Sequence, residues 1–158
     1  MRLAESPPEA PKFVVTSVPM FPDDRSEISD KWAGFPGQRR QLLEAIRSRG
    51  LRKVVFLAGD VHCSSWSELV CPADPGFRVY SVISSPFFFP GPRLGQGDRF
   101  DLQGTIANPP YDFAMGRHGP ILGDDAFTRL SVDAAATSMR VDLYDRKGGL
   151  LTGTVLPL

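Results

Sequence analysis

The chain has 158 residues and a mass of 17.3 kDa, a common size for one globular domain, and its 42% hydrophobic and 23% charged residues suit a buried core rather than a disordered protein. Its 18 basic and 18 acidic residues cancel, which argues against a nucleic-acid-binding surface based on positive charge. No apolar run approaches the roughly 18 residues that span a bilayer, and the first residues lack the apolar stretch of a secretory signal, so we expect a soluble, cytoplasmic protein without a membrane or nucleic-acid partner.

The first part of the chain has the pattern of a strand–helix–strand unit. Residues 1–11, rich in proline and glutamate, are predicted to be a flexible lead-in, and residues 12–158 are predicted to form one domain. Residues 12–18 (KFVVTSV) and 53–58 (KVVFLA) are short apolar runs rich in β-branched side chains, which predicts two strands. Because a helical pattern lies between them, we expect parallel strands joined by a right-handed crossover.

The intervening helix is predicted to begin at Pro36, which is tolerated in a first turn, and to end before Gly50. Apolar side chains recur on one face at helical spacing: Phe35, Leu42, Leu43 and Ile46. Arg39 and Arg40 lie off this stripe. We expect them to be solvated, with contact to a bound phosphate as the alternative.

The second half is rich in strand patterns and contains no second helical pattern of comparable length. Strands are expected at residues 77–84, 127–132, 138–144 and 151–156, with a hairpin turn at 145–149. Glycine and proline number 15 each, which predicts many turns and ordered loops. The predicted fold class is therefore α/β or α+β with a β-rich carboxyl-terminal segment.

Asp60 and His62 directly follow the second predicted strand, in the sequence Gly59-Asp-Val-His. Sites in open α/β sheets form at the carboxyl ends of strands. If the backbone stays extended, residues two apart project to the same side, so the carboxylate and the imidazole would converge. These donors suit iron, manganese or zinc, and Gly59 would permit a tight turn away from the strand. Spacing alone leaves a second interpretation open, in which Asp60 caps the next segment and His62 forms an ordinary hydrogen bond.

Three segments taken together resemble the PhoD-like alkaline phosphatases, a family of calcineurin-like metallophosphoesterases. They are FVVTSVPM (13–20), DKWAGFPGQRRQLL (30–43) and LAGDVH (57–62). The resemblance is clearest over residues 12–89 and covers the carboxyl-terminal half of such an enzyme. It implies half of a β-sandwich flanked by helices, and an enzyme that hydrolyses phosphate mono- or diesters by attack of a metal-activated hydroxide on phosphorus.

The resemblance also implies a cofactor of two or more metal ions, drawn from iron, calcium, manganese or zinc. Asp60 and His62 are implied metal ligands, and Gly59 is implied to support their turn. Asp30 and Trp32 belong to the matching motif and are candidates for substrate contact or for orienting the ligands. From the residues alone, Asp30 as a turn cap and Trp32 as a core side chain explain the same pattern.

The amino-terminal ligand motifs of that family are absent from these 158 residues, and the sequence contains only two histidines. Further oxygen ligands could come from the remaining carboxylates: Asp23, Asp24, Asp30 and Asp112. Otherwise they would come from a missing amino-terminal half. The alternative function is a non-catalytic remnant or accessory domain that binds an anion or a protein partner, or that self-associates.

Three further features have competing interpretations. His118, expected in a flexible loop, is interpreted as a surface histidine, with anion contact beside Arg117 as the alternative. The run at residues 87–90 (FFFP) is expected to pack in the core, although a substrate entrance or a partner surface would use the same residues. Cys63 is interpreted as a buried thiol rather than a nucleophile, and no catalytic nucleophile is assigned.

Overall fold

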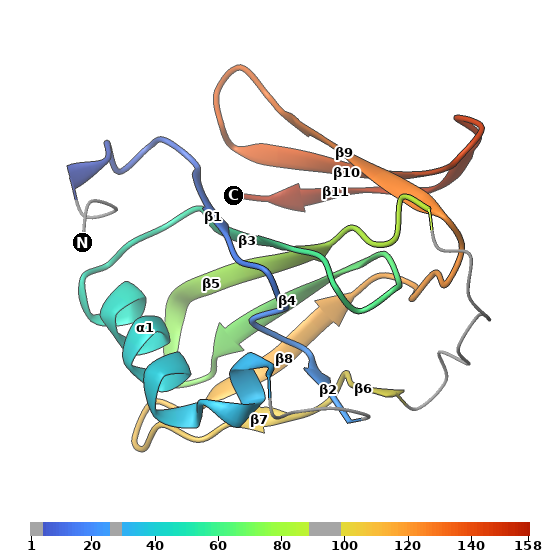
Figure 1. The fold of residues 1–158 in the computed structure, drawn as a ribbon. Coiled ribbons are helices and arrows are strands. Elements are labelled where there is room, and N and C mark those ends of the chain that lie inside the picture. Colours follow the sequence, from blue (N-terminus) through green and yellow to red (C-terminus); the bar gives the residue numbers. More distant parts are fainter. Residues whose placement is uncertain (1–4, 26–29, 89–98) are drawn as a thin grey trace.

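A computed structural model of the chain describes residues 5–25, 30–88 and 99–158 (Figure 1). The elements in chain order are β1 (Lys12–Val15), β2 (Asp23–Asp24), the 3₁₀ turn η2 (Trp32–Gly34), α1 (Pro36–Ser48), β3 (Val54–Ala58), β4 (Ser65–Cys71), β5 (Asp74–Ile83), β6 (Phe100–Asp101), β7 (Thr105–Ile106), β8 (Phe113–His118), β9 (Ala126–Val132), β10 (Ser138–Asp145) and β11 (Leu150–Pro157). The chain is therefore mostly β-sheet with one α-helix in its described part. No helix in that part is long and apolar enough to cross a membrane.

The strands form one large sheet and two smaller ones. The six-stranded sheet has the order β1-β3-β5-β4-β8-β7, the three-stranded sheet has the order β11-β10-β9, and β2 pairs with β6. β1, β3 and β5 are parallel, and β4 and β8 continue the sheet in antiparallel pairs. The predicted parallel pairing of the first two strands is confirmed.

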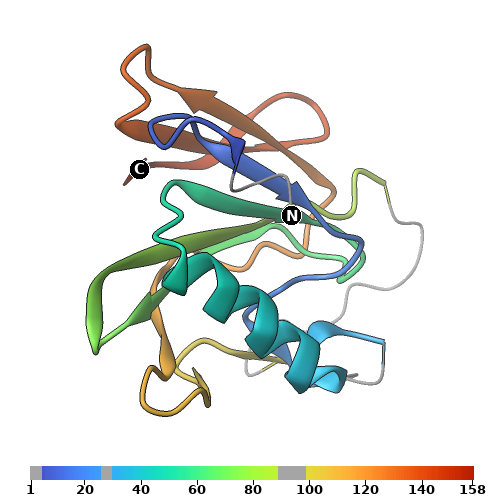
Figure 2. The same cartoon turned by 90° about the vertical axis from the view of Figure 1, so that its left-hand side faces the viewer.

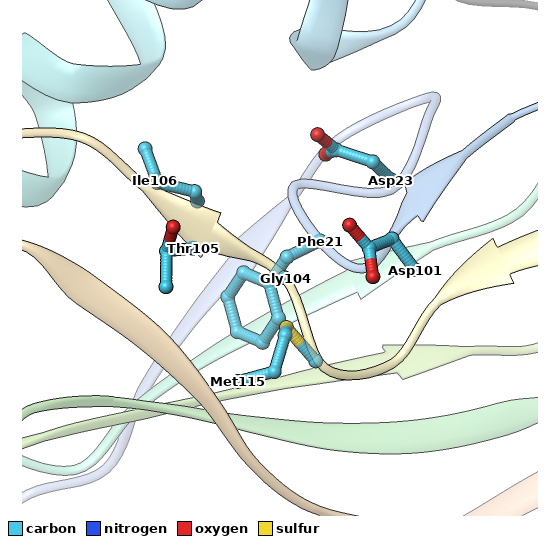
Figure 3. Close-up of a pocket in the computed structure, with 7 residues that line it drawn as sticks. All are labelled: Phe21, Asp23, Asp101, Gly104, Thr105, Ile106 and Met115. Atoms are coloured by element: carbon cyan, nitrogen blue, oxygen red, sulfur yellow. The ribbon is translucent and has the colours of Figure 1, made fainter.

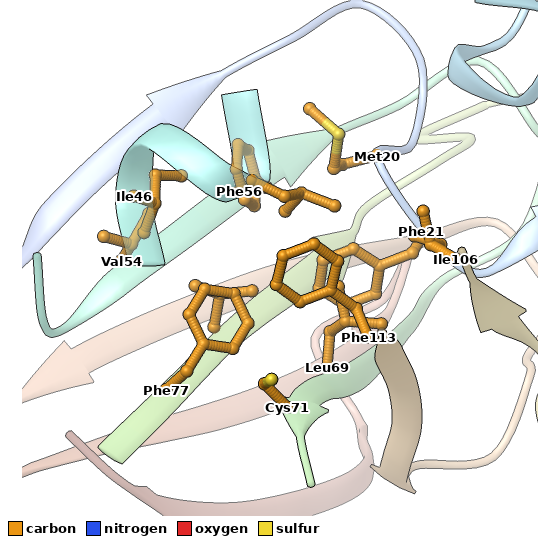
Figure 4. Close-up of a cluster of buried hydrophobic side chains, with 12 residues drawn as sticks. Met20, Phe21, Ile46, Val54, Phe56, Leu69, Cys71, Phe77, Ile106 and Phe113 are labelled. Atoms are coloured by element: carbon orange, nitrogen blue, oxygen red, sulfur yellow. The ribbon is translucent and has the colours of Figure 1, made fainter. Parts of the chain in front are cut away.

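The large sheet lies between two covering layers (Figure 2). Helix α1 covers one face over a core that includes Leu43, Ile46, Phe56 and Phe77 (Figure 4). The three-stranded sheet lies on the other side, and a second core joins it to the large sheet; that core includes Tyr80. Because side chains alternate along a strand, β3 contributes to both cores.

Helix α1 ends as the sequence predicts. Gly50 has a φ of 63°, and its N–H donates to the carbonyl of Arg47 at 2.9 Å. The Leu51 N–H donates to the carbonyl of Ile46 at 3.0 Å. These two hydrogen bonds form a Schellman motif, in which a left-handed residue satisfies the last helical carbonyls.

The prediction of which side chains of α1 are buried is only partly confirmed. Leu43 and Ile46 are fully buried, but Phe35 is 48% exposed. Arg39, expected in solvent, is 5% exposed. The cause is a carboxylate outside the helix: Asp23 forms an ion pair with Arg39 and thereby allows the guanidinium to be buried.

The pattern did not predict the two-residue strands β2, β6 and β7, nor the two longer strands β4 and β8. β4 (SWSELVC) is rich in polar residues, and β8 (FAMGRH) lies where a flexible loop was predicted. A buried carboxylate connects them, because Glu68 of β4 accepts a hydrogen bond from the backbone N–H of Arg117 at 3.1 Å. The Arg117 guanidinium also lies 3.3 Å from this carboxylate. Because this contact joins polar residues that are far apart in the sequence, the spacing of hydrophobic residues does not reveal it.

Candidate functional site

The candidate site lies at the edge where the parallel strands β1, β3 and β5 end. The N–H of Gly59, just after β3, donates to the carbonyl of Ser17 in the segment after β1, at 3.4 Å. The N–H of Ser84, just after β5, donates to the carbonyl of Ala58 at 2.9 Å. The segment with the Gly-Asp-Val-His motif is therefore held between its two neighbours at the carboxyl edge of the sheet, as predicted.

The backbone around Asp60 and His62 differs from the predicted extended strand. Asp60 has a φ of 71° and His62 a φ of 52°, so both adopt the left-handed conformation. The argument that extended alternation aims the two side chains together is therefore wrong. Gly59 has no positive φ, so the turn is made by the two candidate ligands and does not depend on the freedom of this glycine.

Asp60 forms an ion pair with Lys31. The Lys31 Nζ donates to Asp60 Oδ2 and lies 3.4 Å from Asp30 Oδ1. The Lys31 side chain is only 10% exposed, whereas the side chains of Asp60 and Asp30 are 46% and 66% exposed. Burial lowers the pKa of Lys31, but the hydrogen bond and the charge of Asp60 outweigh it and leave the pKa raised. Lys31 is therefore a cation at this site that sequence reasoning missed.

Arg99 holds the turn that carries the motif. Its Nη1 donates to the carbonyl of Val61, between the two candidate ligands, at 2.9 Å, and its Nε donates to Asp24 at 3.0 Å. The Asp24 side chain is 2% exposed, and its hydrogen bond raises the pKa of Arg99. The Arg99 guanidinium also interacts electrostatically with Asp60. The sequence gives no signal for this contact, because 75 residues separate Asp24 from Arg99.

Trp32 lines a hollow next to Lys31. The Trp32 Nε1 donates to Thr16 Oγ1 at 3.0 Å, and the ring packs at the border of the first core. The hollow has a volume of about 320 Å³. Its lining combines polar groups with two aromatic rings: Thr16, Ser17, Val18, Asp30, Lys31, Trp32, Phe35 and Gln38. Asp30 therefore lies near Asp60 through their shared partner Lys31, whereas Trp32 lines the same hollow as Lys31 and has no described contact with Asp60.

Arg39 and the remaining candidate carboxylates have structural partners. Arg39 forms an ion pair with Asp23 and donates to the carbonyl of Met20 at 3.5 Å. Asp23 faces Asp101 across the β2–β6 pair, beside a cavity of about 10 Å³, which has room for one water molecule (Figure 3). Asp112 accepts a hydrogen bond from the N–H of Asn108 at 2.7 Å. None of these contacts provides a further ligand beside Asp60.

The predictions for His118, for Cys63 and for the aromatic run at residues 87–90 are confirmed only in part. His118 is exposed, as expected, but it ends strand β8, three strands away from β3 or roughly 14 Å along the sheet. Cys63 is buried, and burial raises the pKa of its thiol to about 12, which fits an unreactive thiol. Phe87 and Phe88 are 71% and 65% exposed, so core packing is wrong for both. Residues 89 and 90 lie outside the described part of the chain.

The donor set does not by itself fit a metal cluster. In residues 5–25, 30–88 and 99–158, no three His, Cys, Asp or Glu side chains gather as metal ligands. Asp60 and His62 supply one oxygen donor and one nitrogen donor, and the Asp60 carboxylate already has an ammonium partner. A site for two or more metal ions needs more donors than these.

Comparison with known proteins identifies the family. The PhoD-like phosphatase family model matches residues 7–91, which is more than half of the chain. The chain belongs to this family. It is 48% identical to alkaline phosphatase D of Bacillus subtilis (strain 168) over 40 residues, which cover 25% of this chain and 7% of that protein. These comparisons agree with the family that the three sequence segments indicated.

A solved structure shares the fold. The structure described as "Structure of PhoD" aligns with 90% of this chain at a TM-score of 0.55 and 16% identity. The alignment covers 31% of that chain, so these 158 residues span about a third of the solved relative.

Proposed function

We propose that the chain carries one side of the active site of a PhoD-like phosphatase, an enzyme for the metal-dependent hydrolysis of phosphate mono- or diesters. The observation that carries this proposal is the turn after β3: a chain of this family presents a carboxylate and an imidazole at the carboxyl edge of three parallel strands. We further propose that Asp60 and His62 are metal ligands and that the remaining ligands come from a segment outside these 158 residues.

The chain's own residues also suit a phosphate ester substrate. Lys31 and Arg99 place two hydrogen-bond donors near Asp60. Both are ion-paired with carboxylates, so a phosphate oxygen would bind them by taking the place of a carboxylate partner. The adjoining hollow has Trp32 and Phe35 in its lining, and such rings suit the organic part of an ester. In this proposal the cations orient the phosphate while the hollow contacts the alcohol group.

A non-catalytic domain that binds an anion or a protein partner is the second candidate. One observation favours it: the carboxylate that should bind metal is ion-paired with Lys31, and the described residues offer no group of three donors. In this case Lys31 and Arg99 would serve anion binding alone.

The DNA before the Met1 codon separates the two candidates. An in-frame segment encoding further Asp and His ligand motifs would support the enzyme, and the lack of one would support the non-catalytic domain. We then expect the longer protein to hydrolyse p-nitrophenyl phosphate or bis-p-nitrophenyl phosphate. Asp60→Asn and His62→Ala should each reduce the rate at least a hundredfold.

His118→Ala is the matched control, because it removes the other histidine of the chain, which is exposed at the end of β8. We expect it to retain the rate within about twofold. If His62→Ala and His118→Ala have equal effects on both the rate and the bound metal, the assignment of His62 is wrong.

A further inference from the structure

We propose that the chain has a second binding site, for a small phosphate ester, at the amino edge of its parallel strands. A hollow of about 270 Å³ lies where the end of β11 meets the start of β3 and the first half of β5 (Figure 1). Its lining combines three cationic side chains with an aromatic ring and apolar residues: Arg52, Lys53, Gly76, Arg78, Tyr80, Pro157 and Leu158. The length of β3, roughly 17 Å, separates this hollow from the turn with Asp60, so the inference does not depend on the proposed function.

Two of the three cations have no carboxylate partner. In the described part of the chain, neither Arg52 nor Lys53 forms an ion pair with an acidic side chain, and the Lys53 ammonium donates instead to the neutral carbonyl of Ala136. The acidic residue at the start of β5, Asp74, pairs with Arg47 of α1 at 3.3 Å. An anion can therefore bind Arg52 and Lys53 without displacing an acidic side chain.

The third cation, Arg78, shares its carboxylate with another arginine. The Arg78 Nε lies 2.7 Å from Glu68 Oε1, and Arg117 also pairs with this carboxylate. The Glu68 side chain is 5% exposed, whereas that of Arg78 is 47% exposed. A single buried carboxylate thus balances two arginines, so the hollow keeps an excess of positive charge that attracts anions.

The lining fits a phosphate group that carries a small organic part. Guanidinium groups present planar pairs of donors that match the oxygens of a phosphate. Gly76 leaves room for one of them, because a Cβ at this position would lie 2.8 Å from Arg52 Nη2. The Tyr80 hydroxyl donates to the carbonyl of Pro157 at 2.7 Å and fixes the ring beside Pro157 and Leu158. These residues form an apolar wall next to the cations, which suits the alcohol part of an ester.

The test is titration of the chain with phenyl phosphate and with inorganic phosphate at pH 8 and constant ionic strength, followed by the NMR signals of the backbone amides. Phenyl phosphate should shift the signals of residues 52, 53 and 76–80. Its dissociation constant should be at least threefold lower than that of inorganic phosphate, because only the ester contacts the apolar wall. Arg52→Gln should raise this dissociation constant at least fivefold. Arg40→Gln, which removes an equal charge from an exposed position on α1, is the matched control and should change it less than twofold.

Lys31→Gln distinguishes this hollow from the edge that carries Asp60. Because Lys31 lies at the opposite ends of the strands, its substitution should leave the dissociation constant unchanged. The absence of shifts, a loss of affinity in Lys31→Gln as large as that in Arg52→Gln, or equal effects of Arg52→Gln and Arg40→Gln would each overturn the site. Equal affinities for the two ligands would overturn the ester as the ligand and favour free phosphate. Circular dichroism melting shows that each variant is folded.

Discussion

Carboxylates beside the candidate site are neutralised by cations of the same chain. Asp24 is paired with Arg99, and Asp60 is paired with Lys31. The chain has a net charge of zero, and near the strand ends its opposite charges also form ion pairs with each other. Each of these two carboxylates already has a cationic partner, which distinguishes this site from an open cluster of acidic residues.

Asp133 illustrates how hydrogen bonds alone stabilise a carboxylate. The Ser138 hydroxyl donates to Asp133 at 2.7 Å, and the N–H and the hydroxyl of Thr137 each donate at 2.8 Å. These hydrogen bonds, that from Ser138 first, lower the pKa of Asp133 from 3.8 to about 2. The carboxylate is thus favoured in the folded turn between β9 and β10.

The lowered pKa of Asp133 predicts a stability difference that depends on pH. Because the folded pKa lies below the unfolded one, the ionised group stabilises the fold above about pH 4, and this stabilisation is lost as the pH falls toward 2. Urea unfolding of the unmodified chain and Asp133→Asn should differ most between pH 5 and 7. The difference should shrink steadily below pH 4. A difference that is constant from pH 7 to 2 would contradict this assignment.

At the scale of elements, the short β2–β6 pair offers a matched comparison of two ion pairs. Asp23 and Asp101 lie opposite each other across it. Asp23 pairs with Arg39, whose side chain is 6% exposed, and Asp101 pairs with Arg25, whose side chain is 55% exposed. The Asp–Arg ion pair of Asp23 therefore involves a buried arginine of α1, whereas that of Asp101 lies at the surface.

We expect Asp23→Ala to lower the free energy of unfolding by about 3 kcal/mol, because it leaves the Arg39 guanidinium buried without its partner. Asp101→Ala should cost less than about 1 kcal/mol, since both groups of that pair can be hydrated. Chemical denaturation at neutral pH measures both values. Equal losses for the two variants would show that burial of Arg39 does not decide the cost.

The sequence predicted those helices and strands that depend on local patterns of residues. Helix α1 and strands β1, β3, β5, β9, β10 and β11 follow from apolar periodicity, from Gly50 and from the hairpin turn. The Asp145 N–H donates to the Gly149 carbonyl at 2.8 Å in that hairpin. The family motif likewise identified Asp60 and His62 as candidates, and both lie just after β3 at the carboxyl edge of the sheet.

The rest depends on contacts between residues far apart in sequence. β8 is anchored through Glu68, 49 residues away from Arg117, and the turn after β3 is held by Arg99, 38 residues away from Val61. Local periodicity contains no information about such polar pairs. The left-handed φ of Asp60 and His62 was missed because neither is a glycine, the residue whose presence in a sequence signals this conformation.

At the scale of the whole molecule, one sheet supports two cores. Val54 and Phe56 of β3 face the core under α1, and Val55 between them faces the core shared with β9–β11. The two layers cannot separate without exposing one face of the same strands. This arrangement positions the candidate site, because the turn with Asp60 begins where β3 leaves both cores.

The shared sheet predicts that both cores unfold in one transition. Trp32 borders the first core and Trp66 lies in the second, and the chain contains no other tryptophan. Fluorescence of Trp66→Phe therefore reports on the first core, and fluorescence of Trp32→Phe reports on the second. We expect each single-tryptophan variant to give a fluorescence midpoint that coincides with its own circular dichroism midpoint.

Core substitutions make this test sharper. Leu43→Ala in the first core and Leu143→Ala in the second should each lower the free energy of unfolding by about 3 kcal/mol, because both side chains are fully or almost fully buried. If the sheet couples the cores, either substitution shifts the fluorescence transitions of both tryptophans by the same amount. If Leu143→Ala shifted only the Trp66 signal, the three-stranded sheet would unfold independently, and the site at the end of β3 would not depend on it.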